Sequence, residues 1–178
     1  LSTWGTNRTA TTVNMQSMFY DASALTTLNL TDFKTTNVTT MSYMFYSAQA
    51  LKTLNLANWD TASLTSNTSM FANTSNLWQI TLGEKIKFSG TPGFANAPAV
   101  GTTFTDDGQT YQVTKSSWQA VGDGSVHNPT GDLVTTTQMY ADRTTPVTYV
   151  WANKGQSEPR IISVDDINFG EVNLNNTA

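Results

Sequence analysis

His127 is the only histidine in the chain, so it is the first residue to test for catalysis or metal binding. Ser125 lies just before it and would allow a serine–histidine–acid triad, but no Gly-x-Ser-x-Gly elbow accompanies this serine. A histidine beside Asn128-Pro129 is more typical of a turn. One histidine and no cysteine cannot supply a three-histidine or cysteine-ligated zinc site. We therefore expect no catalytic residue and no enzyme.

Adjacent aspartates are the next candidates, because two facing carboxylates can act as the acid and nucleophile of a glycosidase. Asp106-Asp107 precedes Gly108, where a turn alone explains aspartate. Asp165-Asp166 are neighbours on an expected strand, so their side chains point to opposite faces. No calcium loop of the Asp-x-Asp-x-Asp-Gly type occurs. A calcium site is an alternative interpretation of Asp123, Asp132 and Asp142, but solvated loop acids explain them better. The sequence therefore predicts no metal and no cofactor.

Charge and composition exclude several classes of partner. The net charge is −4, and nine Lys and Arg residues are scattered without a basic stripe, which argues against nucleic acid and anionic membranes. No apolar run is long enough to span a bilayer, so we expect no membrane insertion by this fragment. Only 12% of residues are charged, and the many Thr and Asn residues are typical of exported β-rich proteins.

A repeat of 26 residues organises the first half of the chain. The pair Met18-Phe19 recurs as Met44-Phe45 and as Met70-Phe71. The same offset relates Leu25, Leu51 and Leu77; Leu28, Leu54 and Ile80; Leu30, Leu56 and Leu82; Phe33 and Trp59; Val38 and Leu64; and Met15 and Met41. Matched apolar positions in one register indicate stacked structural repeats. Because the chain begins inside a repeat, we expect it to be part of a longer protein.

The spacing of apolar residues changes within each repeat. Leu28 and Leu30 alternate with polar residues, which predicts a short strand over 25–30 and, by the repeat, over 51–56 and 77–82. The residues Val38, Met41, Met44 and Phe45 are three or four apart, which predicts a helix with Asn37 as its N-cap. One strand and one short helix per repeat predict an α/β leucine-rich-repeat solenoid, with a parallel strand ladder on one side and helices on the other.

The string Asn37-Val-Thr-Thr-Met41-Ser-Tyr-Met44-Phe45-Tyr46, together with the segment Leu51–Trp59, resembles the BspA-like leucine-rich repeats of Gram-positive, lactobacterial-type surface proteins. The resemblance covers roughly the first half of the chain. It implies an extracellular location, at the cell surface or in the cell wall, and a role in adhesion. Phe33 and Trp59 stand where leucine-rich repeats usually place an asparagine, so we expect packing to hold that turn.

The sequence after residue 88 loses the repeat. Ser89–Gly93 and Asn96–Pro98 indicate an irregular connection, and the alternating residues on both sides of Asp106-Asp107-Gly108 predict a β-hairpin. We expect residues 89–151 to form a β-rich cap over the solenoid of residues 1–88, with Trp118 and Trp151 as packing anchors. Residues 152–178 are predicted to be a linker and the start of a further β segment. Within them, 164–172 is similar to the opening of WxL cell-wall-binding domains, whose Trp-x-Leu motifs do not occur in this chain.

Strand residues that point away from the core form the candidate binding surface. They are small, neutral hydrogen-bonding side chains, which suit a polar neutral partner such as a glycan or an extended protein segment. A solvated sheet face is the alternative interpretation. The candidate residues are Thr27, Asn29, Thr31, Thr53, Asn55, Gln79 and Thr81.

Three functional hypotheses follow. The first is a non-catalytic adhesion or ligand-binding module whose partner is a host or matrix protein or a glycan. The alternative is a structural spacer or a cell-wall-associated subunit of a surface complex, with peptidoglycan or other cell-wall components as partners. The third is a carbohydrate-active enzyme, which would require hydrolysis that depends on His127.

Overall fold

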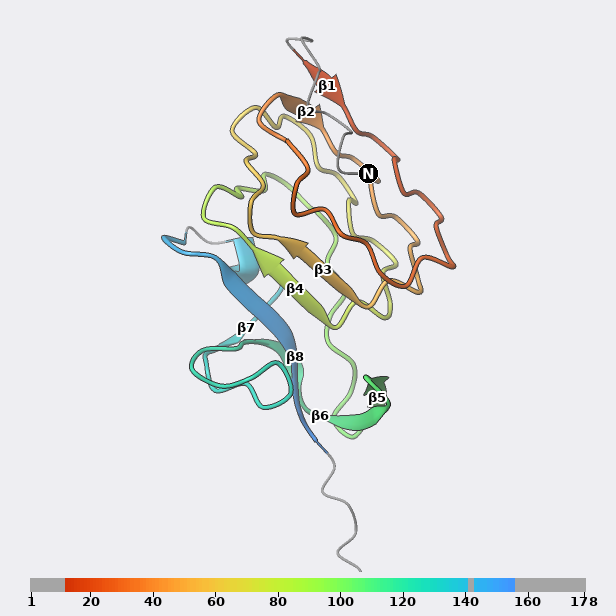
Figure 1. The fold of residues 1–178 in the computed structure, drawn as a ribbon, viewed down its shortest axis with the longest axis vertical. Helices are drawn as coiled ribbons and strands as arrows, with labels where there is room; N and C mark the ends of the chain where they lie inside the picture. The colour runs from red at the N-terminus through yellow and green to blue at the C-terminus, as the bar shows by residue number, and fades with distance from the viewer. Residues whose placement is uncertain (1–11, 141–142, 156–178) are drawn as a thin grey trace, which may run out of the picture.

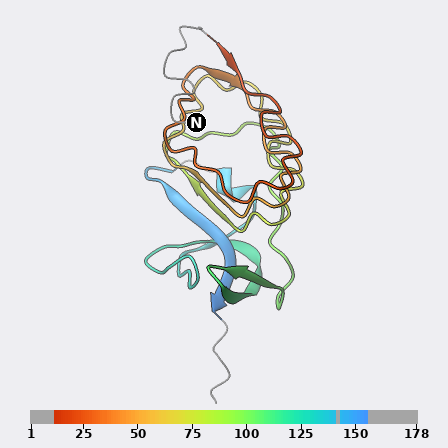
Figure 2. The ribbon, with the colours of Figure 1, turned by 45° about the vertical axis from the view of Figure 1, so that its right-hand side comes forward.

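A computed structural model describes residues 12–140 and 143–155 of this chain. Successive repeats form coils that stack one behind another, and the C-terminal strands continue from the last coil (Figures 1 and 2). The elements are β1 (Val13–Asn14), β2 (Val38–Thr40), β3 (Thr53–Leu56), β4 (Gln79–Leu82), β5 (Thr103–Asp106), β6 (Gln109–Ala120), β7 (Leu133–Val134), the 3₁₀-helix η1 (Gln138–Tyr140) and β8 (Val147–Gly155).

The predicted α/β leucine-rich-repeat solenoid is wrong. Across the described residues the structure has no α-helix, and the segment expected to be helical contains β2 and a series of turns. Asn37 accordingly precedes a strand instead of capping a helix. The described chain forms a two-stranded sheet of β1 and β2 and a six-stranded sheet with the order β3-β4-β8-β6-β5, in which β7 also pairs with β6.

Backbone hydrogen bonds between coils explain why no helix forms. The N–H of Phe45 donates to the carbonyl of Met70 in the next coil at 2.9 Å, whereas the next N–H, that of Tyr46, closes a local turn onto Tyr43 at 3.2 Å. An α-helix needs every interior N–H for the carbonyl four residues earlier. A segment that gives alternate amides to a neighbouring coil therefore cannot be helical. Equivalent inter-coil bonds join Phe19 to Met44 at 2.8 Å and Phe71 to Pro92 at 2.8 Å.

Two residues of each coil adopt left-handed backbone conformations, although neither is glycine. In the middle coil they are Tyr43, with φ of 58°, and Ser47, with φ of 56°. Their equivalents in the other coils are Ser17 and Ser69, and Asp21 and Asn73. Consecutive turns advance the chain by about three residues each, so Met41, Met44 and Ala48 all reach the core. This apolar spacing is the same as that of a helix, which is why the sequence pattern predicted one.

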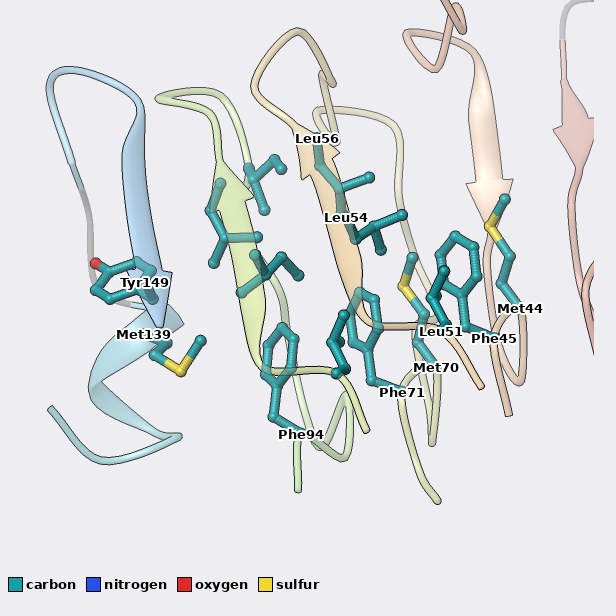
Figure 3. Close-up of a cluster of buried hydrophobic side chains, with 14 of the residues drawn as sticks. Met44, Phe45, Leu51, Leu54, Leu56, Met70, Phe71, Phe94, Met139 and Tyr149 are labelled. Atoms are coloured by element: carbon teal, nitrogen blue, oxygen red, sulfur yellow. The ribbon is translucent and has the colours of Figure 1, made fainter. Parts of the chain in front are cut away.

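The core is a stack of side chains that repeats from coil to coil. Phe45 stacks on Phe71 with ring centroids 5.6 Å apart, and Phe71 stacks on Phe94 at 4.3 Å. Figure 3 shows these three rings in a row, with Leu54 and Leu56 of β3 pointing toward them. Phe94 lies between the two stretches, 89–93 and 96–98, that the sequence indicated as irregular. The connection has no regular secondary structure, but Thr91 and Pro92 accept the inter-coil hydrogen bonds of the third repeat and Phe94 covers its aromatic ring.

The predicted strands are found in two of the three repeats. β3 and β4 pair in parallel with Thr53 opposite Gln79 and Leu56 opposite Leu82, which is the register set by the 26-residue repeat. The segment 25–30 of the first repeat is not a strand. It is linked to the next coil through the N–H of Lys52, which donates to the Thr26 carbonyl at 3.3 Å.

The C-terminal residues extend the repeat sheet. β8 pairs antiparallel with β4, with Ile80 opposite Tyr149, so one sheet crosses the predicted boundary at residue 88. The predicted hairpin is confirmed: β5 and β6 pair around a turn at Asp107 and Gly108, both with positive φ. The buried residues Trp118 and Trp151 face each other across β6 and β8, as expected of packing anchors. β8 continues to Gly155 into the predicted linker, and the segment similar to WxL domains lies outside the described residues.

A buried threonine also ties each coil to the next. The Thr61 hydroxyl accepts a hydrogen bond from the N–H of Lys87 at 2.7 Å and lies 3.1 Å from the Lys85 carbonyl oxygen. Thr35, one repeat earlier, has the same contacts with the backbone of Asp60, at 2.8 and 2.9 Å. The sequence predicted that packing would hold the turn at Phe33 and Trp59. These two rings do stack, and the nearby threonines add a polar bridge between coils that the sequence did not predict.

We predict that Thr61→Val lowers the free energy of unfolding by about 1–3 kcal/mol, because the isosteric side chain leaves the Lys87 N–H without this buried acceptor. Urea titration followed by circular dichroism measures the change. Thr68→Val, at an exposed threonine of the neighbouring turn, serves as the control and should change stability by less than about 0.5 kcal/mol. Equal effects of the two substitutions would contradict a specific role for the Thr61 hydroxyl.

Candidate functional site

The predicted surface residues come together in the structure. Six of the seven line one shallow depression of 380 Å³, which we call the polar face. β3 provides Thr53 and Asn55, β4 provides Gln79, and the first coil provides the irregular segment Thr27–Thr31. Leu28 and Leu54 also contribute to the lining. The repeat therefore aligns polar side chains from three successive coils.

Thr81 is the predicted residue that does not line the polar face. It lies opposite Asn55 in the β3–β4 register, but its hydroxyl is 2.8 Å from the hydroxyl of Thr148 on β8. The antiparallel pairing of β4 with β8 thus gives Thr81 a partner inside the protein. The sequence could not reveal this contact, because the two threonines are 67 positions apart.

The two asparagines of the polar face also shape the backbone. The side-chain oxygen of Asn29 accepts from the Thr31 N–H at 3.1 Å, and that of Asn55 accepts from the Ala57 N–H at 3.0 Å. These are the bonds that asparagine makes when it fixes a turn two residues further on. The side-chain oxygen of each asparagine is therefore used within the protein, while its side-chain NH₂ group can still donate a hydrogen bond to a ligand.

His127 lies in an aromatic environment beside a carboxylate. Its Nε2 atom is 3.2 Å from Oδ2 of Asp106, and its ring stacks on Tyr111 with a centroid distance of 3.7 Å and on Trp78 at 5.1 Å. Nδ1 is buried without a hydrogen-bond partner among the described residues. Sequence reasoning treated Asp106 as a turn residue and missed this pair, because the contact joins two separate hairpins.

The arrangement around His127 does not bring Ser125 into a triad. Ser125 is exposed and pairs through its backbone with Asn128, which closes the tight turn that carries His127. In the described structure Nε2 faces Asp106 and Nδ1 has no partner, so neither ring nitrogen is hydrogen-bonded to a serine hydroxyl. The geometry offers an imidazole–carboxylate pair whose imidazole stacks on Tyr111 and Trp78, which packs the 125–128 turn against the β5–β6 hairpin and the residue that precedes β4.

The carboxylates considered for metal binding are not brought together. No group of three or more His, Cys, Asp or Glu side chains that could hold a metal ion occurs in the described residues. Asp123 and Asp132 are exposed, whereas Asp142 and Asp165-Asp166 lie outside the residues that the structure describes. Within the same residues, no helix has the length and apolar character needed to cross a membrane.

Exposed tyrosines on the turn side of the coils were missed by sequence reasoning. Tyr20 is 52% exposed and stacks on Tyr46 at 5.0 Å, and Tyr43 is 37% exposed and meets Tyr46 edge-on at 5.8 Å. Tyr20 and Tyr46 are equivalent in the repeat, and this was the signal available in the sequence. The third coil has Ala72 there, so the aromatic row ends after two coils.

Comparison with known proteins gives a family match for the first part of the chain. Residues 1–83 match the model of a family described as Mycoplasma protein of unknown function, DUF285. The match coincides with the 26-residue repeats and ends at the close of β4. No curated protein and no solved structure matches the chain.

We predict that Asn55→Ala lowers the free energy of unfolding by about 1 kcal/mol, because the Ala57 N–H loses its acceptor, as at a helix N-cap. Asn55→Asp retains an acceptor oxygen and should lose less. Asn37→Ala, at an exposed asparagine, is the control and should change little. Chemical denaturation of the four proteins measures these differences, and equal losses for alanine and aspartate at position 55 would rule out the turn-fixing role.

Proposed function

We propose that this chain is a non-catalytic binding module of an extracellular bacterial surface protein, and that it binds a glycan or an extended protein segment on the polar face. The observation that carries the proposal is the convergence of six predicted residues from three coils on one depression. The match of residues 1–83 to a family associated with BspA-like surface repeat proteins supports a location at the cell surface or in the cell wall.

The chemistry of the polar face favours a neutral, extended partner. Its lining contains threonine, asparagine, glutamine and leucine, with no charged side chain. Neighbouring strands of a sheet lie about 4.8 Å apart, so similar hydrogen-bonding groups recur at that interval across the coils. An extended ligand crossing the coils would meet the same kind of group at each step. Because Asn29 and Asn55 are already fixed by their turns, little conformational freedom would be lost on binding.

A second candidate function is a structural spacer or a cell-wall-associated subunit of a surface complex. The observation that favours it is the absence of aromatic side chains from the lining of the polar face. Tight interfaces are usually centred on buried tryptophan, tyrosine or arginine. A face without them suits weak, repeated contacts, as in cell-wall association, with affinity supplied by other parts of a longer protein.

A glycan and matrix-protein array tests the binding proposal. We expect Thr27→Glu combined with Gln79→Glu to reduce binding at least tenfold, because two carboxylates are placed in a neutral depression. Thr68→Glu, in the exposed turn between Asn67 and Ser69, introduces the same charge elsewhere and should leave binding intact. Unchanged binding by the double variant would show that the binding site lies outside the polar face.

Peptidoglycan sedimentation separates the two functions. The spacer hypothesis expects a longer natural protein containing this chain to sediment with peptidoglycan, while the chain alone remains in solution and binds nothing on the array. The binding proposal expects array signals from the chain alone. Sedimentation of the chain alone that persists in the double variant would contradict a role for the polar face in either function.

A further inference from the structure

A second depression lies where the repeat strands meet the C-terminal strands. Its volume is 240 Å³, and we call it the junction pocket. Four separate parts of the chain supply its lining: the residues that enter β3 and β4, the edge strand β5, and β8. The lining residues are Lys52, Asn76, Trp78, Thr103, Phe104, Thr105 and Trp151. None of them belongs to the polar face.

Aromatic rings form rigid walls of the junction pocket. Phe104 lies 5.0 Å from Trp78 and 5.5 Å from Trp151 between ring centroids, and the second contact is edge-on. Both tryptophans are almost fully buried, and their backbones are joined, since the Trp151 N–H donates to the Trp78 carbonyl at 2.9 Å. The half-buried ring of Phe104, held against these two buried tryptophans, is the apolar surface that remains accessible, and it suits the C–H face of a small ring.

The polar lining of the junction pocket combines the Lys52 ammonium with the side chains of Asn76, Thr103 and Thr105. Lys52 donates from Nζ to the Thr105 carbonyl at 3.1 Å, which leaves two of its three N–H groups. The indole N–H groups of Trp78 and Trp151 are buried and have no hydrogen-bond partner in the described part of the chain. Both indole N–H groups are closed off from solvent, so the donors that a ligand reaches in this pocket are those of the Lys52 ammonium and of the neighbouring polar side chains.

The positive charge of the junction pocket favours a negatively charged ligand over a neutral one. Lys52 is the only charged residue in its lining. The nearest carboxylate along β5 is that of Asp106, which is engaged by His127. A depression of 240 Å³ accommodates a ligand of about the size of a single sugar ring. The ligand therefore needs a small C–H-rich ring, several acceptor oxygens and a negative charge.

We propose that the junction pocket binds one carboxylate-bearing sugar, such as a uronic acid residue at the end of a glycan. The carboxylate lies at Lys52, and the ring lies against the aromatic walls. This site is additional to the polar face of the proposed function, and either site can fail without the other.

Titration of the whole chain with glucuronate, and with glucose as the neutral control, tests the proposal. Calorimetry measures affinity, and the indole N–H signals in ¹H–¹⁵N spectra report the location. We expect glucuronate to bind at least tenfold more tightly than glucose and to shift the signals of Trp78 and Trp151. The indole of Trp118 already donates to the Ala95 carbonyl at 2.9 Å, so its signal should stay in place.

Substitutions separate the junction pocket from a general charge effect. Lys52→Gln should weaken glucuronate binding at least tenfold, whereas Lys34→Gln removes the same charge at an exposed site in the first coil and should have no effect. The polar-face variant Thr27→Glu should still bind glucuronate, which keeps this test independent of the proposed function. The proposal is overturned by unsaturable glucuronate binding, by equal affinity for glucose, by indole shifts confined to other tryptophans, or by unchanged affinity in Lys52→Gln.

Discussion

Alternate backbone amides of the Met–Phe turns donate to the next coil, and the rest of the repeat structure depends on this arrangement. The bond from Phe45 N–H to the Met70 carbonyl fixes the distance and register between two coils. That register places phenylalanine over phenylalanine and Thr35 one coil from Thr61. It also brings Thr53 opposite Gln79, so the inner core and the outer polar face share one constraint.

The apolar repeat predicted the core well, because burial follows from residue type and position. Most matched leucine, methionine and phenylalanine positions of the second and third repeats are buried, including Met44, Phe45 and Leu54, whereas those of the first repeat are mainly half-buried. The helix was predicted wrongly because consecutive turns and an α-helix share nearly the same spacing of apolar residues. What distinguishes them is the left-handed conformation at Tyr43 and Ser47, residue types that do not favour it strongly. The serine, aspartate and asparagine at equivalent positions were weak signals of turns.

The candidate sites were predictable to different degrees for a physical reason. The polar face was predicted from alternation within short strands, which places Thr53 and Asn55 on β3 and Gln79 on β4. The three residues of segment 27–31 line the same depression although that segment is not a strand. The junction pocket depends on β8 pairing with β4, a contact between segments almost seventy residues apart that no local pattern encodes. The same pairing gives Thr81 its partner, Thr148, and removes it from the polar face. The contact of His127 with Asp106 likewise joins two turns that are separate in sequence.

The two proposed sites differ in whether their polar groups already have hydrogen-bond partners within the protein. On the polar face the acceptor atoms of Asn29 and Asn55 already serve the backbone, so the fold is stable there without a partner. In the junction pocket the indole N–H groups of Trp78 and Trp151 are desolvated without compensation. A buried donor without an acceptor costs about 1–3 kcal/mol, so the contact between the repeats and the C-terminal strands is the less completely hydrogen-bonded part of the fold. A ligand that binds the junction pocket of the native protein would stabilise that contact by mass action, whereas the polar face can select a partner by shape and repetition.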